Sequence, residues 1–483
     1  MTRSHALTLA AVLAAYCGLA VAVPPADDEL YYWCWSRQLQ LSYYDHPPMT
    51  AYMIRASTEV FGDNLFAIRF PACLATTIVL GVVVYLTRSW KVLVWVGLCP
   101  LFSIGAVLIT PDTPLLLFWA LYLVWLVAVH RRLEPDATGR PGRVPVWHWA
   151  VGGVLLGCGV LGKYTAGLAG IAGFLSFVLA GGWRRWLAGY VLHGLIAVAV
   201  ASPILVYNVR NDFAPLLYQW GHAMGSHGPG VKPFAEFVGV QLLLFGTLPL
   251  LLLPWVAVNF RRLSTDPVLR VCACLYGFPF AFFLFKATRG PLEGNWALAS
   301  YIAAWPLAAA WYESVRGRWA ERWALPASFA LPALVTLTVA AHLIHPLPIV
   351  SPTADRITRQ TVKQQVADDL RAAIEARGER LPVYVETYQM ASLLRFHGVD
   401  ARQIDGASRP SHFTQTHDRV SDAPRAYVVW EHFPNQAQVN GCRLIERIAA
   451  LPIMVRGELK AYYTLSLYTK PDPPAPPGGG TVP

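Results

Sequence analysis

Carboxylates beside apolar segments are the residues best suited to acid–base chemistry in this chain. Asp27, Asp28 and Glu29 stand together at the start of an aromatic run, and Asp112 stands where one apolar run ends and the next begins. A like-charged neighbour or partial burial raises a carboxyl pKa, which lets the group accept a proton from a substrate hydroxyl. The same residues can instead cap the N-termini of helices. The motifs alone leave both interpretations open.

Lone cations between apolar runs are candidates for holding a phosphate. Lys163 lies between two such runs, and Lys286 and Arg289 follow another, just before the chain-bending pair Gly290 and Pro291. An ammonium is a good point charge for an anionic head group, and a guanidinium binds phosphate oxygens in pairs. The alternative for Lys163 is a snorkelling side chain whose stem packs against apolar surface.

Two histidines suggest a metal site only weakly. His222 and His227 lie in one glycine-containing loop, and with Asp45 they could hold a divalent cation. Their spacing matches no clear ligand pattern, and a histidine in such a loop is more often simply polar. The sequence therefore leaves metal dependence open.

The composition indicates that a membrane protein carries these residues. Of 483 residues, 55% are hydrophobic and only 14% are charged, well below the charged fraction of about 25% in soluble domains. A helix needs roughly 20 apolar residues to cross about 30 Å of hydrocarbon. The hydropathy criterion predicts roughly eleven transmembrane helices, at about 1–23, 65–87, 92–109, 113–130, 147–161, 165–181, 187–207, 236–258, 268–285, 296–312 and 323–345.

Basic residues predict the orientation. The net charge of +10 does not indicate nucleic-acid binding, because Lys and Arg lie in short clusters between apolar runs rather than on one basic face. By the positive-inside rule these clusters mark cytoplasmic loops: Arg88 with Lys91; Arg131 with Arg132, Arg140 and Arg143; Arg184 with Arg185; Arg261 with Arg262; and Arg316 with Arg318 and Arg322. The intervening loops hold the acids and lone cations named above. An active site on the outer face follows, because ionisable groups at a membrane boundary are costly unless they pair or act.

The predicted domain organisation has three parts. Residues 1–345 form the transmembrane domain, whose first outer loop covers 24–64. Residues 346–470 have far more charge, a helical pattern from Asp355 to Ala376 and strand patterns at Val383–Glu386 and Ala426–Trp430. They predict a small α/β domain outside the membrane. Residues 471–483, rich in Pro and Gly, are expected to be disordered.

Six motifs together resemble a known family. They are Asp-Asp-Glu-Leu-Tyr-Tyr-Trp-Cys-Trp-Ser from Asp27, Ser-Tyr-Tyr-Asp-His-Pro-Pro from Ser42, Thr-Pro-Asp-Thr-Pro from Thr110, Gly-Lys-Tyr-Thr-Ala from Gly162, Tyr-Asn-x-x-Asn-Asp-Phe from Tyr207, and Arg-Gly-Pro-x-Glu-Gly-Asn-Trp from Arg289. In this order they resemble bacterial glycosyltransferase family 39 proteins, relatives of protein O-mannosyltransferases and of the lipid A aminoarabinose transferase. The likeness covers about residues 1–312, and the combination is far more specific than any single motif.

The resemblance implies an all-α GT-C membrane fold and a role for each motif. By that resemblance, Asp28 looks like the catalytic carboxylate, Glu29 its support, Asp112 the second essential acid and Lys163 the phosphate-binding lysine. We assign the remaining candidates to the donor phosphate (His46, Lys286, Arg289) and to the acceptor and sugar pocket (Tyr31, Tyr32, Asp45, Asn208, Glu293).

One departure concerns the carrier phosphate and the metal. Where the aminoarabinose transferase branch has Glu-Lys-Pro-Pro, this chain has Asp45-His46-Pro47-Pro48. His46 would then replace a lysine, with a charge that depends on pH. That branch's metal site would fall on Asp45 and His222.

The predicted function is transfer of a sugar from a polyprenyl-phosphate donor to a lipid, glycan or protein acceptor, with inversion, on the outer face of the bacterial inner membrane. The alternative is a transporter or flippase of a lipid-linked sugar. Such proteins bind at the bilayer midplane, commonly between repeated halves. Here the polar residues lie at one face and the halves show no evident symmetry, which favours the enzyme.

Overall fold

The computed structural model describes residues 3–135, 142–224, 230–317, 319–415, 420–432 and 437–470. Its internal contacts divide the chain into two compact units. The first comprises Met1–Val23 and Trp35–His345, and the second comprises Pro24–Cys34 and Pro346–Pro483. The start of the expected first outer loop therefore groups with the C-terminal part of the chain.

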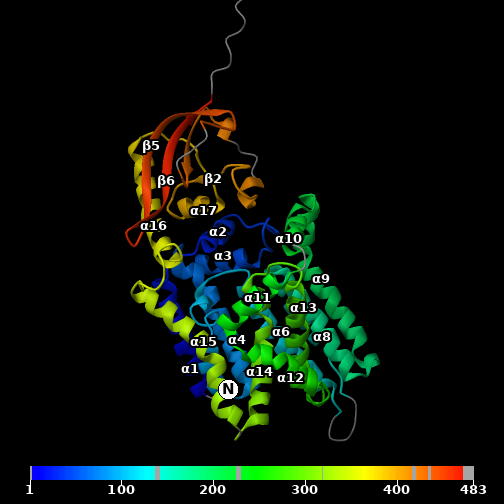
Figure 1. Ribbon diagram of the computed structural model, residues 1–483. Helices are drawn as coiled ribbons and strands as arrows, with labels where there is room; N and C mark the ends of the chain where they lie inside the picture. Colours follow the sequence, from blue (N-terminus) through cyan, green and yellow to red (C-terminus); the bar gives the residue numbers. More distant parts are fainter. Residues whose placement is uncertain are drawn as a thin grey trace, which may run out of the picture. The chain divides into compact units, whose positions relative to one another are not determined.

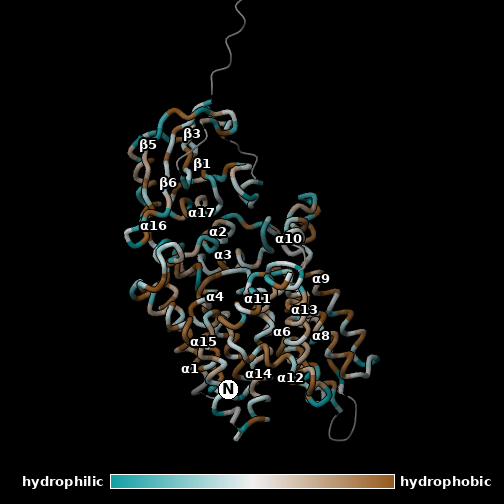
Figure 2. The backbone as a smooth tube through the Cα atoms, in the orientation of Figure 1, coloured by the Kyte–Doolittle hydropathy of each residue, from teal (hydrophilic) through white to brown (hydrophobic). Residues whose placement is uncertain are grey.

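Helices make up the first unit (Figure 1), and apolar residues dominate along them (Figure 2). Helix α2 (Asp27–Arg37) begins in the second unit and ends in the first. The other helices of the first unit are α1 Arg3–Ala22, α3 Met49–Phe61, α4 Leu65–Thr87, α5 Lys91–Gly97, η1 Gly105–Val107, α6 Asp112–Leu133, α7 Val146–Gly162, η2 Tyr164–Ala166, α8 Gly167–Ala180, η3 Trp183–Arg185, α9 Leu187–Arg210, α10 Ala214–Met224, α11 Val231–Phe245, α12 Leu248–Leu263, α13 Pro267–Ala287, η4 Gly294–Ala297, α14 Ser300–Val315 and α15 Trp319–Ile344.

Five of the described helices are long and apolar enough to cross a membrane: α4, α6, α9, α13 and the Pro326–Ile344 part of α15. The number rises to 7 if each of two bent pairs is one span, and two further apolar helices are shorter. The prediction of a multi-pass membrane protein is confirmed. Among the described helices, fewer than the predicted eleven meet the length and hydropathy needed to cross a membrane.

Two predicted spans are wrong in detail. The span at 92–109 is instead the short α5, an irregular stretch and η1, because Pro100 lacks an N–H and disfavours helical backbone in the residue before it. The span at 236–258 is two helices, α11 and α12, bent by 105°. The bend occurs at Gly246, whose φ is +73° and where a Cβ would lie 1.8 Å from the Ser328 carbonyl oxygen.

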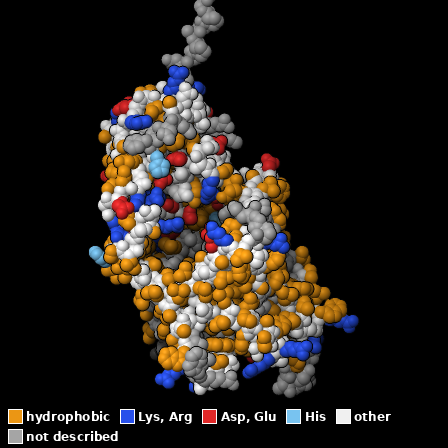
Figure 3. Space-filling view, in the orientation of Figure 1, with side chains coloured by type: hydrophobic (Ala, Val, Ile, Leu, Met, Phe, Trp, Pro, Cys, Tyr) orange, Lys and Arg blue, Asp and Glu red, His pale blue; other side chains and the backbone are white. Residues whose placement is uncertain are grey.

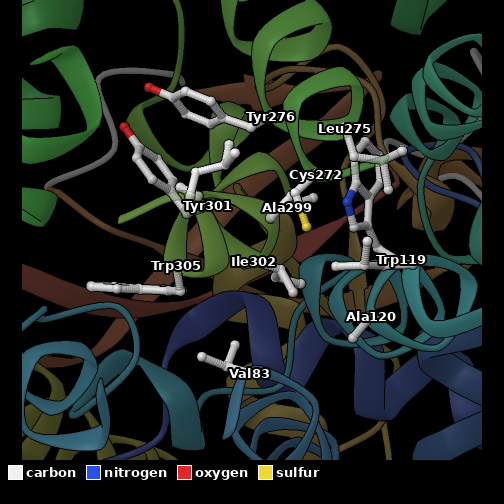
Figure 4. Packing of buried hydrophobic residues seen from close by; sticks show 14 of the residues in the cluster. Val83, Trp119, Ala120, Cys272, Leu275, Tyr276, Ala299, Tyr301, Ile302 and Trp305 are labelled. Atoms are coloured by element: carbon white, nitrogen blue, oxygen red, sulfur yellow. The ribbon is translucent and has the colours of Figure 1, made fainter. Parts of the chain in front are cut away.

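Aromatic and small side chains fill the core of the first unit (Figure 4). Val83 of α4, Trp119 of α6, Tyr276 of α13 and Ile302 of α14 are all at most 3% exposed. Helix α7 packs between α6 and α9. A Cβ at its Gly152 would lie 2.2 Å from the Trp125 ring, so only glycine permits this approach. The close packing fixes the end of α7, where Lys163 follows.

The second unit is built on a six-stranded sheet in the order β2-β1-β3-β6-β5-β4. Strand β1 (Val383–Val385) pairs in parallel with β2 (Ala401–Gln403) and β3 (Arg425–Trp430), and the remaining pairs are antiparallel. Strands β5 (Cys442–Val455) and β6 (Glu458–Thr469) form a long hairpin whose turn, Arg456-Gly457, has positive φ at both residues, the geometry that follows the twist of paired strands. Strand β4 is Gln438–Val439.

Helices cover this sheet as expected from the sequence. Helix α16 (Arg356–Ala376) packs on β5 and α17 (Tyr388–Phe396) on β1 and β2. The Asp355 side chain caps α16 by accepting a bond of 2.9 Å from the Thr358 N–H. The predicted helix at 355–376 and both predicted strands are confirmed. Residues 471–483, where disorder was expected, lie outside the described residues.

Candidate active site

In the first unit, Asp112, Lys163 and Asn295 form a buried polar cluster. The Lys163 Nζ donates to Asp112 Oδ1 at 2.7 Å, and the Asn295 Nδ2 donates to Asp112 Oδ2 at 2.5 Å. The Lys163 and Asp112 side chains are only 12% and 8% exposed. Each carboxylate oxygen of Asp112 thus has its own donor, which holds the group in one orientation.

Helix ends bring the ion pair together. Asp112 is the first residue of α6, and Lys163 directly follows α7. An acid at a helix N-terminus and a base at a C-terminus are both favoured by the helix dipole. A Cβ at Gly162 would lie 2.9 Å from the Pro114 ring, so glycine lets the end of α7 come close to the first turn of α6. Asp112 therefore sits at a helix start, as one interpretation held, and also pairs with Lys163.

Asn295 is placed by a second set of contacts. It belongs to η4, whose Gly294 carbonyl accepts from the Gln241 side chain at 3.0 Å. The Tyr301 hydroxyl donates to Gln241 Oε1 at 2.7 Å, and both side chains are at most 1% exposed. Buried polar groups that are mutually satisfied specify one arrangement. This network fixes the backbone next to the amide that orients Asp112.

The cluster suits the recognition of a phosphate. A lysine ammonium has three N–H donors, and the ion pair with Asp112 uses one of them. The other two can bind an anion. Asp112 fixes the position of the Lys163 ammonium. The ion pair as a whole is close to neutral, so it needs no further counter-charge when the site is empty.

Other predicted residues of the first unit have different surroundings. Asn208 is 2% exposed and its amide bridges the end of α9: Nδ2 donates to the Ile204 carbonyl at 2.9 Å, and Oδ1 accepts from the Leu216 N–H at 3.0 Å. The Asp45 carbonyl accepts from the Gln219 side chain. The His46 carbonyl accepts from the Tyr43 N–H at 3.3 Å.

The metal prediction gains no support from these residues. Asp45 is buried at 4% exposure, and the side chain of His222 lies outside the described part of the chain. Within the described residues, no group of three or more His, Cys, Asp or Glu side chains could hold a metal ion. A metal site at Asp45 and His222 therefore stays a prediction.

Lys286 lies in the last turn of α13, and Arg289 and Glu293 lie on the connection from α13 to η4, the helix that contains Asn295. Arg289 is exposed and its guanidinium lies 5.3 Å from the Phe285 ring centroid. Among the described contacts, no hydrogen bond or ion pair joins these three residues to Asp112 or Lys163. Their roles in binding the donor or the sugar stay predictions.

In the second unit, Asp27 is paired with a lysine of the C-terminal domain. Its Oδ2 accepts from Lys363 Nζ at 3.0 Å and from Gln360 Nε2 at 2.9 Å, both on α16. The Lys363 side chain is 9% exposed. The first of the three acids is therefore neutralised and serves to join the start of α2 to α16.

Asp28 and Glu29 differ sharply in their surroundings. Glu29 is completely buried, and its Oε2 accepts from the Ala26 N–H at 2.9 Å, a helix-capping contact. Asp28 Oδ1 accepts from the Tyr388 hydroxyl at 2.9 Å, and the Arg409 guanidinium lies 4.3 Å from the Tyr388 ring centroid. Burial, and then the charge of Asp28, raise the pKa of Tyr388 well above its usual value, so the hydroxyl keeps its proton and donates it to the hydrogen bond.

Further aromatic rings lie beside the hydrogen-bonded pair of Asp28 and Tyr388. The Tyr31 ring centroid lies 4.6 Å from that of Tyr388 and 5.2 Å from that of Phe413, and its hydroxyl accepts from the His412 N–H at 2.6 Å. Tyr32 is buried at 6% exposure, with its ring 6.2 Å from that of Tyr31. Burial, and then the nearby Arg395 charge, lower the pKa of His412 to about 4.

Six of the predicted residues thus fall into two clusters, one in each unit. Asp112 and Lys163 meet in the first, and Asp28, Glu29, Tyr31 and Tyr32 belong to the second. The sequence analysis missed Asn295, although it lies within the motif that begins at Arg289. It also missed Tyr388 and Lys363, for which the sequence offers no signal, since nothing beyond residue 346 resembles a known motif.

Comparisons with known proteins agree with the resemblance. The family model for dolichyl-phosphate-mannose-protein mannosyltransferases matches residues 45–207, a region that contains Asp112 and Lys163. The chain is 25% identical over 305 residues to the lipid A galacturonosyltransferase RgtD of Rhizobium johnstonii, covering 60% of this chain and 62% of that protein. It is 26% identical over 286 residues to undecaprenyl phosphate-alpha-4-amino-4-deoxy-L-arabinose arabinosyl transferase 1 of Pseudomonas fluorescens, covering 54% and 47%.

The fold comparison extends over nearly the whole chain. The crystal structure of ArnT from Cupriavidus metallidurans bound to undecaprenyl phosphate matches with a TM-score of 0.60 at 15% identity, covering 96% of this chain and 98% of that one. The chain spans less than two thirds of the length of the two curated relatives. The predicted GT-C fold and the resemblance to membrane glycosyltransferases of the aminoarabinose transferase type are confirmed.

Proposed function

We propose that this protein transfers a sugar from a polyprenyl-phosphate donor to a lipid acceptor, with inversion, on the outer face of the bacterial inner membrane. The observation that carries the proposal is the buried Lys163–Asp112–Asn295 cluster, in which a lysine is oriented at the end of a membrane helix with two N–H donors left for a phosphate. The relatives whose names mention undecaprenyl phosphate and lipid A support the donor and acceptor classes.

The reaction needs one base and one phosphate site. The acceptor hydroxyl loses its proton to Asp28 while its oxygen attacks the anomeric carbon of the sugar. The bond from that carbon to the carrier phosphate breaks, and the polyprenyl phosphate leaves with the electron pair. One displacement inverts the configuration and needs no nucleophilic carboxylate.

Lys163 supplies the electrostatic part of this mechanism. Negative charge on the phosphate increases as the bond to the sugar breaks, and a donor already oriented toward it stabilises the transition state by several kcal/mol. Asp112 and Asn295 act as positioning residues in this scheme. They hold the ammonium so that little reorganisation is needed during the reaction.

Asp28 fits the role of base better than its two acidic neighbours do. Asp27 is neutralised by Lys363, and Glu29 is fully buried in a helix-capping contact. Asp28 accepts a hydrogen bond from the Tyr388 hydroxyl, which orients its carboxylate without the helix-capping role of Glu29. Tyr388 places a residue of the C-terminal domain beside the proposed base.

A transfer assay tests the proposal. Membranes containing the protein receive a radiolabelled polyprenyl-phosphate sugar and a lipid A acceptor, and the label on the acceptor is counted. Wild-type protein should transfer the label, Asp28→Asn should abolish transfer at normal protein levels, and Asp27→Asn should retain part of it. Near-wild-type turnover by Asp28→Asn would refute the role of the base. Movement of the donor across the bilayer without transfer would favour a transporter.

A further inference from the structure

The end of α6 that lies away from Asp112 holds a buried cation. His130 lies 18 residues beyond Asp112 on α6 (112 to 130), roughly 27 Å at 1.5 Å per residue. Beside it is Arg270 of α13, which is only 8% exposed. Both helices are long and apolar enough to span a membrane. This arginine is therefore far from the Asp112 cluster and has no part in the proposed transfer.

Hydrogen bonds show that His130 does not compensate the charge of Arg270. The Ser176 hydroxyl donates to the Gly173 carbonyl at 2.6 Å, so its oxygen accepts from His130 Nε2 at 2.8 Å. With its proton on Nε2, the imidazole accepts from Arg270 Nη2 at Nδ1, at 3.3 Å. The ring is neutral and orients the guanidinium, as does the Ser264 carbonyl, which accepts from Nη1 at 2.8 Å.

The charge of Arg270 has no close counter-ion among the described residues. No described carboxylate lies within 4.0 Å of it, and its Nε is buried without a hydrogen-bond partner among them. Glu134 lies at the edge of the same region but is exposed. A buried arginine without a close counter-ion is costly, which makes an external anion a favourable addition.

A cavity of about 230 Å³ opens beside this guanidinium. His130, Glu134, Arg185, Trp186 and Arg270 contribute to its wall. The volume is below the range of roughly 300 to 1,000 Å³ typical of sites for drug-sized ligands, so the cavity suits a compact group. Two guanidinium groups on one small cavity match the geometry of a phosphate, whose oxygens they bind in pairs.

The surroundings point to a lipid as the source of that phosphate. The cavity lies at the ends of apolar helices, where Arg131 and Arg132 are in the last turn of α6 and Trp186 contributes an aromatic wall. Tryptophan is typical of the membrane interface. Figure 3 shows Lys and Arg side chains at the lower end of the helical unit, below its apolar surface. A phospholipid headgroup reaches this level of the bilayer with its chains beside the helices.

We propose that this cavity, lined by Arg185 and Arg270, binds the phosphate of an anionic phospholipid headgroup at the basic end of the membrane helices. A bound headgroup phosphate would neutralise the charge of Arg270 and contact the ends of α6, α8 and α13 at once. The site is separate from the proposed donor site, so it does not depend on the proposed function.

Binding to the purified full-length protein tests the site. Native mass spectrometry in detergent would compare phosphatidylglycerol, diacylglycerol, which lacks the phosphate, and inorganic phosphate. We expect phosphatidylglycerol to bind and diacylglycerol not to bind. Arg270→Gln and Arg185→Gln should each weaken binding by roughly tenfold or more, the effect of one charge-assisted contact. Arg185 is exposed, so its variant tests the site even if Arg270→Gln fails to fold.

Arg131→Gln is the matched control, because it removes an exposed charge from the same helix end without lining the cavity. It should leave binding unchanged. Equal weakening by Arg131→Gln and Arg185→Gln would overturn the proposal in favour of general attraction to a basic surface. Retention of inorganic phosphate but not of phosphatidylglycerol would overturn the lipid source.

Discussion

Replacing Lys163 by methionine tests the ion pair with Asp112 directly. The substitution keeps most of the length of the side chain and removes its charge, leaving a carboxylate that is 8% exposed with Asn295 as its remaining donor. Removing one partner of a buried ion pair costs about 3 to 5 kcal/mol, because the other charge stays buried without compensation. Since both side chains retain some exposure, we expect a loss near the lower limit, about 3 kcal/mol.

The double variant separates structure from chemistry. In Lys163→Met with Asp112→Asn no charge is left buried, so the protein should regain part of the lost stability. The coupling between the two sites should be about 1 to 3 kcal/mol, as for other contacting residues. Sugar transfer should stay absent in both variants, because neither has the ammonium that would bind the donor phosphate.

The assay is equilibrium unfolding in mixed detergent micelles, followed by circular dichroism, together with the radiolabel transfer assay. Lys91→Met is the control, since Lys91 is an exposed lysine of the same unit, and surface substitutions usually change stability by less than about 0.5 kcal/mol. The contrary result is a double variant that is no more stable than Lys163→Met, with a free energy of unfolding equal to that expected from adding the two single substitutions. It would show that the pair does not stabilise the fold. That result would refute the proposed positioning of Lys163 by Asp112.

Three further predictions concern single residues. Tyr388→Phe keeps the ring contact with Tyr31 but removes the hydroxyl that donates to Asp28. The kcat for sugar transfer should therefore fall roughly tenfold or more, with Tm unchanged. An unaltered kcat would contradict this. Burial lowers the pKa of His412 from 6.5 to about 4, so the stability present above pH 6.5 is lost as the pH falls toward 4. The decrease in Tm over this pH window should therefore be smaller in His412→Gln than in the wild type. Parallel plots of Tm against pH for the two proteins would disprove this. Gly162→Ala should cost about 1 to 3 kcal/mol and reduce transfer because its Cβ meets Pro114, whereas Gly167→Ala, with open space around it, should be near neutral in the same unfolding assay.

The two units divide the proposed machinery in a way that bears on these experiments. Variants of Asp112 and Lys163 act within the helical unit, and variants of Asp28 and Tyr388 act within the unit that contains the C-terminal sheet. A change in stability caused by either set should therefore appear in the unfolding of its own unit. Loss of transfer by both sets would be the functional sign that both clusters serve one reaction.

The class of protein and the chemical types of its site follow from local features of the sequence. Apolar runs predict membrane helices because their length matches the bilayer, and the motifs around Asp28, Asp112 and Lys163 mark polar groups where lipid disfavours them. Helix α16 and strands β1 and β3 were predictable for the same reason, since their patterns and the cap at Asp355 lie within short segments.

Tertiary structure alone decided which of these residues meet. Asp112 is separated by 51 positions from Lys163 and by 183 from Asn295, and Asp28 is separated by 360 from Tyr388. Such contacts depend on close packing, for example of Gly162 against Pro114, and no local pattern encodes that. The break between α11 and α12 is similar, because it depends on the approach of the Ser328 carbonyl to Gly246. Hydropathy measures how apolar a segment is, whereas these contacts are set by the shapes of surfaces far apart in the chain.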